Sequence, residues 1–175
     1  MALDRIRQLS AHEIGHTLGI SHNFAASVGD RASVMDYPHP LLSFDEQGKL
    51  DVSRGYAMGM GVWDTQVIKY GYSDFTNQNE AEALAAILKE NNTKGLEFIS
   101  DNDARAAGGA HPTAHLWDNG AAPSEELLRV LEVRKQALAQ FGTGLARPFA
   151  WALAALRIGP RLVSAGTFTD HNRVR

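Results

Sequence analysis

Residues 12 to 22 read His-Glu-Ile-Gly-His-Thr-Leu-Gly-Ile-Ser-His, and this stretch constrains the chain more than any other feature. His12 and His16 are four residues apart, so on a helix their imidazoles lie on one face, about one turn apart. Gly19 stands where a glycine can end the helix in the left-handed conformation, after which the chain turns back and offers His22. Three histidines leave the fourth tetrahedral position of a zinc ion open, which is typical of catalytic sites. The spacing therefore predicts Zn2+ bound by His12, His16 and His22.

Glu13 follows the first histidine and lies about 100° further round the helix. From there its carboxylate can touch a water on the metal without being a ligand itself. Five fixed residues at fixed offsets arise by chance about once in three million windows. A closed structural zinc site is disfavoured, because the chain has no cysteine and Glu13 would then have no purpose. The motif therefore indicates a catalytic metal site.

Length and composition indicate one globular domain. The chain has 175 residues, of which 44% are hydrophobic and 21% charged. Its net charge of −3 offers no basic surface for nucleic acid and no polybasic membrane patch. No apolar run approaches the roughly 20 residues that a membrane-spanning helix needs. We therefore expect neither a nucleic-acid partner nor a membrane segment in this chain.

The zinc motif resembles that of the metzincin metallopeptidases, in which a methionine turn (Met-turn) follows the third histidine. Here Ser33-Val34-Met35-Asp36-Tyr37-Pro38 places Met35 thirteen residues after His22. Together with GVWDTQVIKYGYSDF and HLWDNG further along, this resembles the bacterial Met-zincin family of large zinc-dependent metalloproteases, over residues from about 11 to 141. The resemblance implies a hydrolase that cleaves peptide or protein substrates, with Glu13 as general base and with relatives that are periplasmic or secreted.

For the fold, the resemblance implies a metzincin-like catalytic subdomain built on the zinc helix and the Met-turn. Only eleven residues precede His12, so we expect the upstream β-sheet subdomain to be missing here and to belong to a longer parent protein. The remainder should be mainly α, or α+β at most. We expect a zinc-binding core in residues 1–75, a helical family-specific extension packed on it in residues 76–158, and a weakly ordered tail in residues 159–175.

Hydrophobic periodicity predicts local elements along the chain. Helices are expected near residues 3–18, 63–70, 79–90 and 124–141, a hairpin or irregular loop within 42–52, and a short strand at 96–100. The expected core faces of the last two helices are Ala81, Leu84, Ala85 and Leu88 in one, and Leu127, Leu128, Leu131, Leu138 and Phe141 in the other.

Several residues carry more than one interpretation. Met35 is expected to form an apolar floor under the zinc ligands. Tyr37 either approaches the metal and stabilises the oxyanion of the reaction, or is a buried structural tyrosine. The histidines outside the motif, and one tryptophan, either border the substrate cleft or serve only packing and surface roles; they are His39, His111, His115 and Trp117. Asp101-Asn102-Asp103 lacks the ligand spacing of a calcium loop, so we expect a solvated turn there.

The function expected from the motif and the resemblance is that of a zinc metalloendopeptidase. The alternative, from a different class, is a catalytically incompetent fragment that keeps the zinc site and acts as a folded or binding remnant. In the resembled family, the side of the zinc helix away from the metal meets the upstream half of the domain. We therefore expect Leu3, Ile14 and Leu18 to be under-packed, and the chain alone to be a poor protease.

Overall fold

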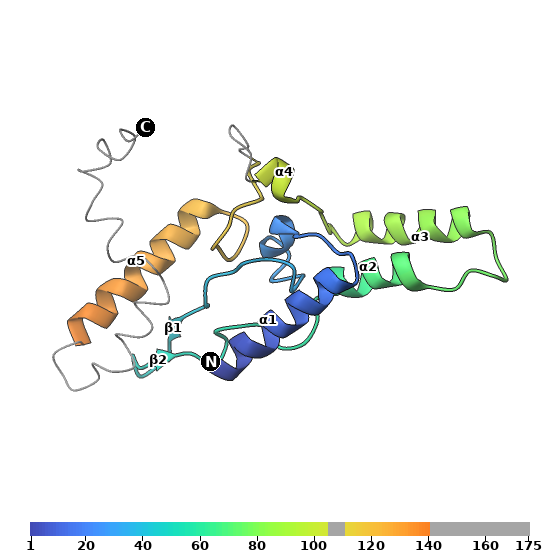
Figure 1. Cartoon of the computed structure of the whole chain (residues 1–175). Coiled ribbons are helices and arrows are strands. Elements are labelled where there is room, and N and C mark those ends of the chain that lie inside the picture. Colours follow the sequence, from blue (N-terminus) through green and yellow to red (C-terminus); the bar gives the residue numbers. More distant parts are fainter. Residues whose placement is uncertain (105–110, 141–175) are drawn as a thin grey trace, which may run out of the picture. The chain divides into compact units, whose positions relative to one another are not determined.

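A computed structural model describes residues 1–104 and 111–140 (Figure 1). The elements in order are α1 (Ala2–Thr17), the 3-10 helix η1 (Phe24–Ser27), β1 (Ser43–Phe44), β2 (Leu50–Asp51), α2 (Val62–Tyr72), α3 (Glu80–Thr93), α4 (Asp101–Ala104) and α5 (Pro123–Gln140). In these two ranges the β structure is one two-stranded antiparallel hairpin, with Ser43 opposite Asp51 and Phe44 opposite Leu50. The expectation of a mainly α fold is confirmed. Within the same ranges no helix combines the length and apolar character needed to cross a bilayer.

The chain forms two compact units that do not follow its linear order. Among the described residues, the first comprises 1–41, 53–104 and 111–127, and the second comprises 42–52 and 128–140. The first unit holds the histidine motif and the Met-turn; the second holds the hairpin and most of α5. Within the second unit, Arg129 donates a hydrogen bond of 2.8 Å from Nη1 to the Leu42 carbonyl oxygen. The division expected at residues 75 and 158 stays a prediction, and its tail, 159–175, lies outside the described residues.

Helix α1 ends as the sequence predicts, through a left-handed glycine. Gly19 has a φ of +78°. Its N–H donates to the His16 carbonyl at 2.9 Å, and the N–H of Ile20 donates to the Gly15 carbonyl at 3.1 Å. This pair of bonds is a Schellman motif, which satisfies carbonyl groups that the end of a helix leaves without partners. The reversal of the chain directs residues 20–22 back toward the helix.

One face of α1 is buried and the rest is exposed. The buried residues are Gln8, His12 and Gly15. Leu3 and Ile14 remain 66% and 58% exposed, and Leu18 is also exposed. The expectation that the side away from the metal is under-packed is therefore confirmed.

The Met-turn packs directly on the buried face of α1. Met35 is fully buried, in a cluster with Val34 and Trp63. A Cβ atom placed on Gly15 would come within 2.3 Å of the Met35 sulfur, so the contact requires a glycine at that point of the helix. The thioether thus lies against the helix between the turns that carry His12 and His16.

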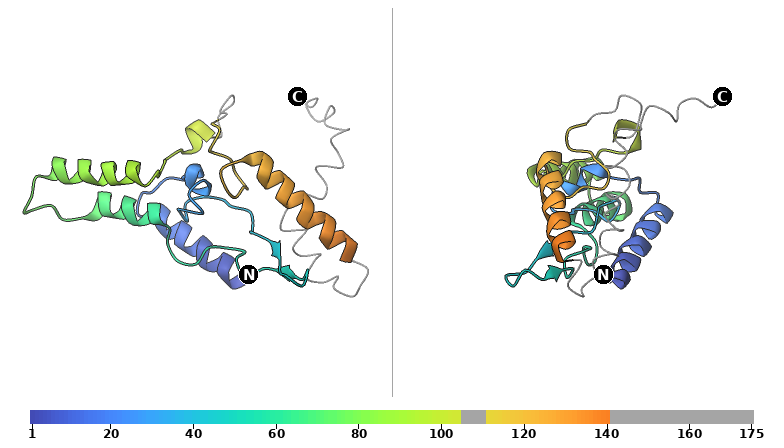
Figure 2. Two further views of the ribbon diagram at one scale, coloured as in Figure 1. Left: turned by 180° about the vertical axis from the view of Figure 1, so that it is seen from behind. Right: turned by 90° about the vertical axis from the view of Figure 1, so that its left-hand side faces the viewer.

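Asp64 fixes the Met-turn to the start of α2. Its Oδ1 accepts a hydrogen bond of 2.5 Å from the Ser33 hydroxyl, and its Oδ2 accepts bonds of 2.9 Å from Val34 N–H and 2.6 Å from Gly61 N–H. The carboxylate therefore caps the start of α2 and also holds the turn. Helix α3 lies beside α2 after the chain turns back (Figures 1 and 2).

The expected core faces of α3 and α5 are wrong. In α3 the buried residue is Ile87, whereas Leu88 is exposed, as are Ala81 and Ala85, and Leu84 is half-buried. In α5 the buried apolar residues are Val130, Val133 and Ala137, whereas Leu127, Leu128, Leu131 and Leu138 are exposed. Each helix has two adjacent apolar stripes, and periodicity does not reveal which one meets the core. Phe141 lies outside the described residues.

The strand expected at residues 96–100 is not formed. The main chain of this segment bonds to the loop after the histidine motif rather than to a strand. Phe24 N–H donates to the Ile99 carbonyl at 2.8 Å. A buried side chain, Asn23, supplies the other bonds: its Nδ2 donates to the Glu97 carbonyl at 2.9 Å, and its Oδ1 accepts from Ile99 N–H at 3.2 Å.

Two carboxyl groups are buried, one of them in the Met-turn itself. Asp36 is 2% exposed and Asp118 is 8% exposed. Burial raises the pKa of Asp36 to about 8, against hydrogen bonds from the N–H groups of Tyr37 and Ser27; the charge of Asp118 raises it further. Burial also raises the pKa of Asp118 to about 6, although the Ser27 hydroxyl and the charge of His115 lower it. Both groups therefore hold protons in the folded chain at pH values where an unfolded aspartate is ionised.

This difference predicts a pH-dependent effect of Asp36→Asn. The folded pKa is above the unfolded value of 3.8, so the stability that the protonated carboxyl contributes is complete below about pH 4 and is lost as the pH rises toward 8. Asparagine keeps an oxygen for the Tyr37 N–H but does not ionise. The free energy of unfolding of the variant relative to wild type should therefore rise between pH 4 and 8, by up to about 1.4 kcal/mol per pH unit.

Urea unfolding at pH 5, 6, 7 and 8 measures this relative stability. Asp103→Asn, at an exposed carboxylate, is the matched control and should show a flat difference. A difference for Asp36→Asn that is equally flat would contradict the burial argument.

Candidate metal centre

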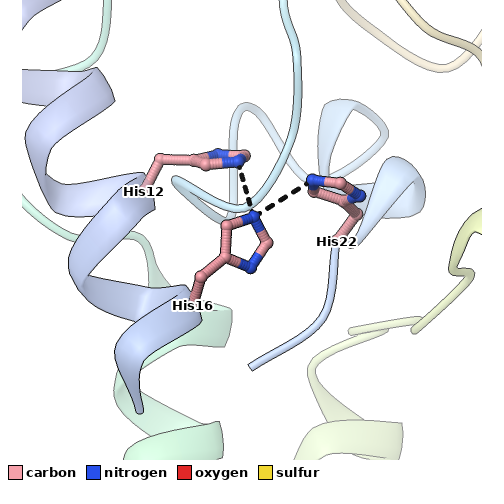
Figure 3. A group of neighbouring side chains, drawn as sticks. All are labelled: His12, His16 and His22. Atoms are coloured by element: carbon pink, nitrogen blue, oxygen red, sulfur yellow. Dashed lines mark hydrogen bonds between the residues drawn. The ribbon is translucent and has the colours of Figure 1, made fainter. Parts of the chain in front are cut away.

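The structure brings the three histidines of the motif together. His12 and His16 project from α1, and His22 comes from the chain after Gly19 (Figure 3). The Nε2 atom of His16 lies 3.1 Å from Nε2 of His12 and 3.1 Å from Nε2 of His22. One ligand nitrogen from each residue lies within 4.8 Å of the others. In residues 1–104 and 111–140 this is the group of histidine and acidic side chains arranged to hold a metal ion.

Each imidazole is oriented by a hydrogen bond at Nδ1, the ring nitrogen that is not directed at the other histidines. Nδ1 of His12 lies 2.7 Å from the Val34 carbonyl oxygen, and Nδ1 of His16 lies 2.9 Å from the Ile20 carbonyl oxygen. Nδ1 of His22 lies 2.6 Å from Oδ2 of Asp101. All three partners are acceptors, so each Nδ1 carries the hydrogen and donates it. In a neutral ring the Nε2 atom is then left with an unprotonated lone pair.

The converging lone pairs define what the centre can bind. Nε2 of His16 faces each of the other two Nε2 atoms at 3.1 Å, and acceptors this close repel unless a cation or a proton lies between them. Tetrahedral nitrogen ligands of zinc, at about 2.0–2.1 Å from the ion, stand about 3.3 Å apart. The observed separations match this spacing. The donor set is also the one expected for zinc, since neutral imidazole nitrogen is among its usual ligands.

The electrostatic setting keeps His12 neutral. This side chain is fully buried. Burial lowers its pKa, and the charges of His16 and His22 lower it further, against the Val34 hydrogen bond and the charge of Glu13, which raise it. A metal ligand must be deprotonated, so a lowered imidazole pKa favours metal over proton near neutral pH.

Tyr37 lies at the centre rather than away from it. Its hydroxyl is 3.1 Å from Nε2 of His22, and its ring centroid is 4.8 Å from that of His12. The side chain is half-buried. Tyr37 therefore lies next to the histidines, with its hydroxyl within hydrogen-bonding distance of His22, and its catalytic role stays a prediction.

Trp117 supports Tyr37 from a strained backbone. Its φ is +64°, which is rare for a bulky residue and costs on the order of 1–3 kcal/mol. Its N–H donates to the Tyr37 carbonyl at 3.0 Å, and its ring lies 5.7 Å from the Tyr37 ring and 5.8 Å from the His39 ring. Trp117 and His39 therefore form an aromatic border beside Tyr37, outside the three-histidine group.

The remaining candidates occupy distinct places. Glu13 is exposed on α1, directly after His12, and Met35 is buried against Gly15. His111 contacts its neighbour Thr113, with 3.1 Å between Nδ1 and the hydroxyl oxygen. His115 lies near Asp118 and lowers the pKa of that carboxyl.

Sequence reasoning missed Asp101. The Asp101-Asn102-Asp103 stretch was expected to be a solvated turn, but Asp101 begins α4 and its carboxylate reaches His22, 79 residues earlier in the chain. No local pattern signals this contact. The sequence also contains no pattern that predicts the hydrogen bonds of Asn23 to the segment just before α4.

Of three comparisons with known proteins, the one with family models finds a match. A comparison with curated proteins gives no significant match, and neither does one with solved structures. The sequence model of the family described as Met-zincin matches residues 1–149, which is most of the chain and includes the three histidines and the Met-turn. The chain therefore belongs to the Met-zincin family.

Proposed function

We propose that this protein is a zinc-dependent metalloendopeptidase. The observation that carries the proposal is the convergence of three Nε2 lone pairs, each oriented by a hydrogen bond at the opposite nitrogen. Membership of the Met-zincin family supports the same assignment. Three protein ligands leave a fourth position for water or substrate, which is what a hydrolytic centre needs.

The residues of the chain divide the chemistry among them. A zinc ion held by His12, His16 and His22 would polarise the scissile carbonyl and acidify a water molecule. Glu13 would serve as general base toward a water molecule and as general acid toward the leaving amine. The Tyr37 hydroxyl donates a hydrogen bond to the negative charge that develops on the carbonyl oxygen. Met35 gives the ligand-bearing helix a rigid apolar support.

The first test concerns the metal. The purified chain should bind close to one zinc ion, and His22→Ala should weaken binding while the circular dichroism of the helices stays unchanged, because His22 lies outside α1. Metal analysis after reconstitution at neutral pH measures the stoichiometry. His111→Ala is the control and should bind zinc as wild type does. A chain that retains no zinc would refute the site.

A second test separates metal binding from catalysis. Glu13→Gln should keep the zinc, since no ligand is lost, while hydrolysis of a fluorogenic peptide should fall by about 10²–10⁴-fold because the base is lost. The assay compares the rates of wild type and variant at equal zinc content. Peptide cleavage at the wild-type rate by this variant would show that Glu13 is not the base.

A third test addresses Tyr37. If its hydroxyl serves the transition state, Tyr37→Phe should lower kcat by about 10²-fold with little change in KM. Steady-state kinetics on the same peptide give both constants. Phenylalanine keeps the ring packing against His12, so a change in kcat below about threefold would assign the tyrosine a structural role instead.

The alternative function is a catalytically incompetent zinc-binding remnant. It is favoured by the exposed apolar side of α1, where Leu3 and Ile14 are both more than half exposed, because a substrate cleft depends on fixed walls to position its substrate. One zinc ion per chain together with no detectable cleavage of casein or peptides would support the remnant. Casein cleavage that the Glu13→Gln substitution abolishes would exclude it.

A further inference from the structure

The third histidine of the centre is held differently from the other two. His12 and His16 lie on a regular helix, and their Nδ1 atoms bond to main-chain carbonyls. Such acceptors do not depend on the side chains of the residues that supply them. His22 lies on irregular chain beyond Gly19, and its Nδ1 bonds at 2.6 Å to the carboxylate of Asp101. Among the three, the orientation of His22 therefore depends on a side chain from a distant part of the sequence.

The position of Asp101 is itself set by the residue that follows His22. Asn23 is fully buried, and its amide group bonds to the main chain at Glu97 and at Ile99. Its own N–H donates to the Met35 carbonyl at 3.0 Å, and the Phe24 N–H donates to the Ile99 carbonyl at 2.8 Å. We call this set of bonds the Asn23 clamp. It ties the 97–99 segment to the Met-turn and to the loop that carries the third histidine.

The clamp ends two residues before Asp101, which then opens α4. The Asp101 side chain is 43% exposed, but its backbone is thus only two residues from a main-chain group bonded by the clamp. A charge-assisted hydrogen bond of 2.6 Å is also stronger than a neutral one, roughly by a factor of two. A carboxylate on the far nitrogen of a metal-binding imidazole fixes the tautomer and makes the ligand nitrogen more basic.

We propose that Asp101 is a positioning residue of the metal centre: its carboxylate holds the His22 imidazole with Nε2 toward His12 and His16, and the Asn23 clamp delivers it there. This inference rests on the zinc centre of the proposed function. It assigns part of that centre to the segment after α3, which is remote in sequence from the motif. Loss of Asp101 should leave all three ligands in the chain but let the third one rotate.

Zinc affinity of the full 175-residue chain tests the proposal, measured by competition with a chromophoric chelator at fixed pH. Asp101→Ala should weaken binding by about 10–100-fold. Asp101→Asn keeps an acceptor oxygen of the same shape without its charge, so it should fall between wild type and the alanine variant. Asp103→Asn, on the same short helix, is the matched control and should bind as wild type.

A second readout uses the metal-free protein. Long-range 1H–15N NMR reports which nitrogen of His22 carries hydrogen; wild type should show the Nδ1–H form, and Asp101→Ala should show a mixture of tautomers. A purely structural role for Asp101 would disturb helix content without changing the tautomer of a folded chain. Circular dichroism of each variant measures helix content and so distinguishes a loss of structure from a change of tautomer. The asparagine variant is nearly isosteric with wild type, so it provides the test if the alanine variant does not fold.

The outcomes distinguish this inference from the proposed function. Zinc affinity of Asp101→Ala within twofold of wild type, while His22→Ala loses zinc, would overturn the role of Asp101 and leave the zinc centre intact. An unchanged His22 tautomer in Asp101→Ala would overturn it as well. A wild-type chain that binds no zinc would refute the proposed metal centre, whereas the NMR comparison, made without metal, decides the role of Asp101 independently.

Discussion

The contact between α1 and the Met-turn is the constraint on which the rest of the first unit depends. The Val34 carbonyl oxygen accepts from His12 Nδ1 at 2.7 Å and from Gln8 Nε2 at 3.1 Å, so one main-chain group is bonded to two turns of the helix. Gly15 then admits the Met35 thioether. Because a glycine at this point lets the turn approach the helix backbone so closely, the same contact packs the core and orients the first ligand.

Buried polar groups, more than apolar area, specify this arrangement. The carboxylate of Asp64 bonds to three groups around the Met-turn, and the amide of Asn23 bonds to the segment before α4. Each of these side chains is almost completely buried. A buried hydrogen-bonding group that loses its partner costs about 1–3 kcal/mol, so such groups disfavour alternative packings of the loops. Because the helices of this chain leave many leucines exposed, buried hydrogen bonds of this kind contribute more to the choice of loop packing than they would in a chain with a larger apolar core.

The sequence predicts features that depend on local interactions, and it does not predict features that depend on contacts between distant residues. The end of α1 at Gly19, the hairpin within 42–52 and the convergence of the histidines come from local geometry, and these expectations are confirmed. The core faces of α3 and α5 required knowledge of which neighbour each helix meets, and those expectations are wrong. Asp101 and Asn23 act across more than 70 residues through single hydrogen bonds, which leave no periodic pattern in the sequence.

The different surroundings of Trp117 and Trp63 have a consequence for the fluorescence of the protein. Its indole is partly exposed, beside the Tyr37 ring, whereas the indole of Trp63 is buried and stacked on Phe98, with ring centroids 5.5 Å apart. Indole emission depends on the polarity and the quenching groups around the ring, so these two tryptophans differ in colour and in sensitivity. A change in the packing of the Tyr37 ring would alter the surroundings of Trp117, which lies 5.7 Å from it between ring centroids. Among the described tryptophans, Trp117 is thus placed to report on the edge of the centre and Trp63 to serve as a reference in the core, while Trp151 lies outside the described residues.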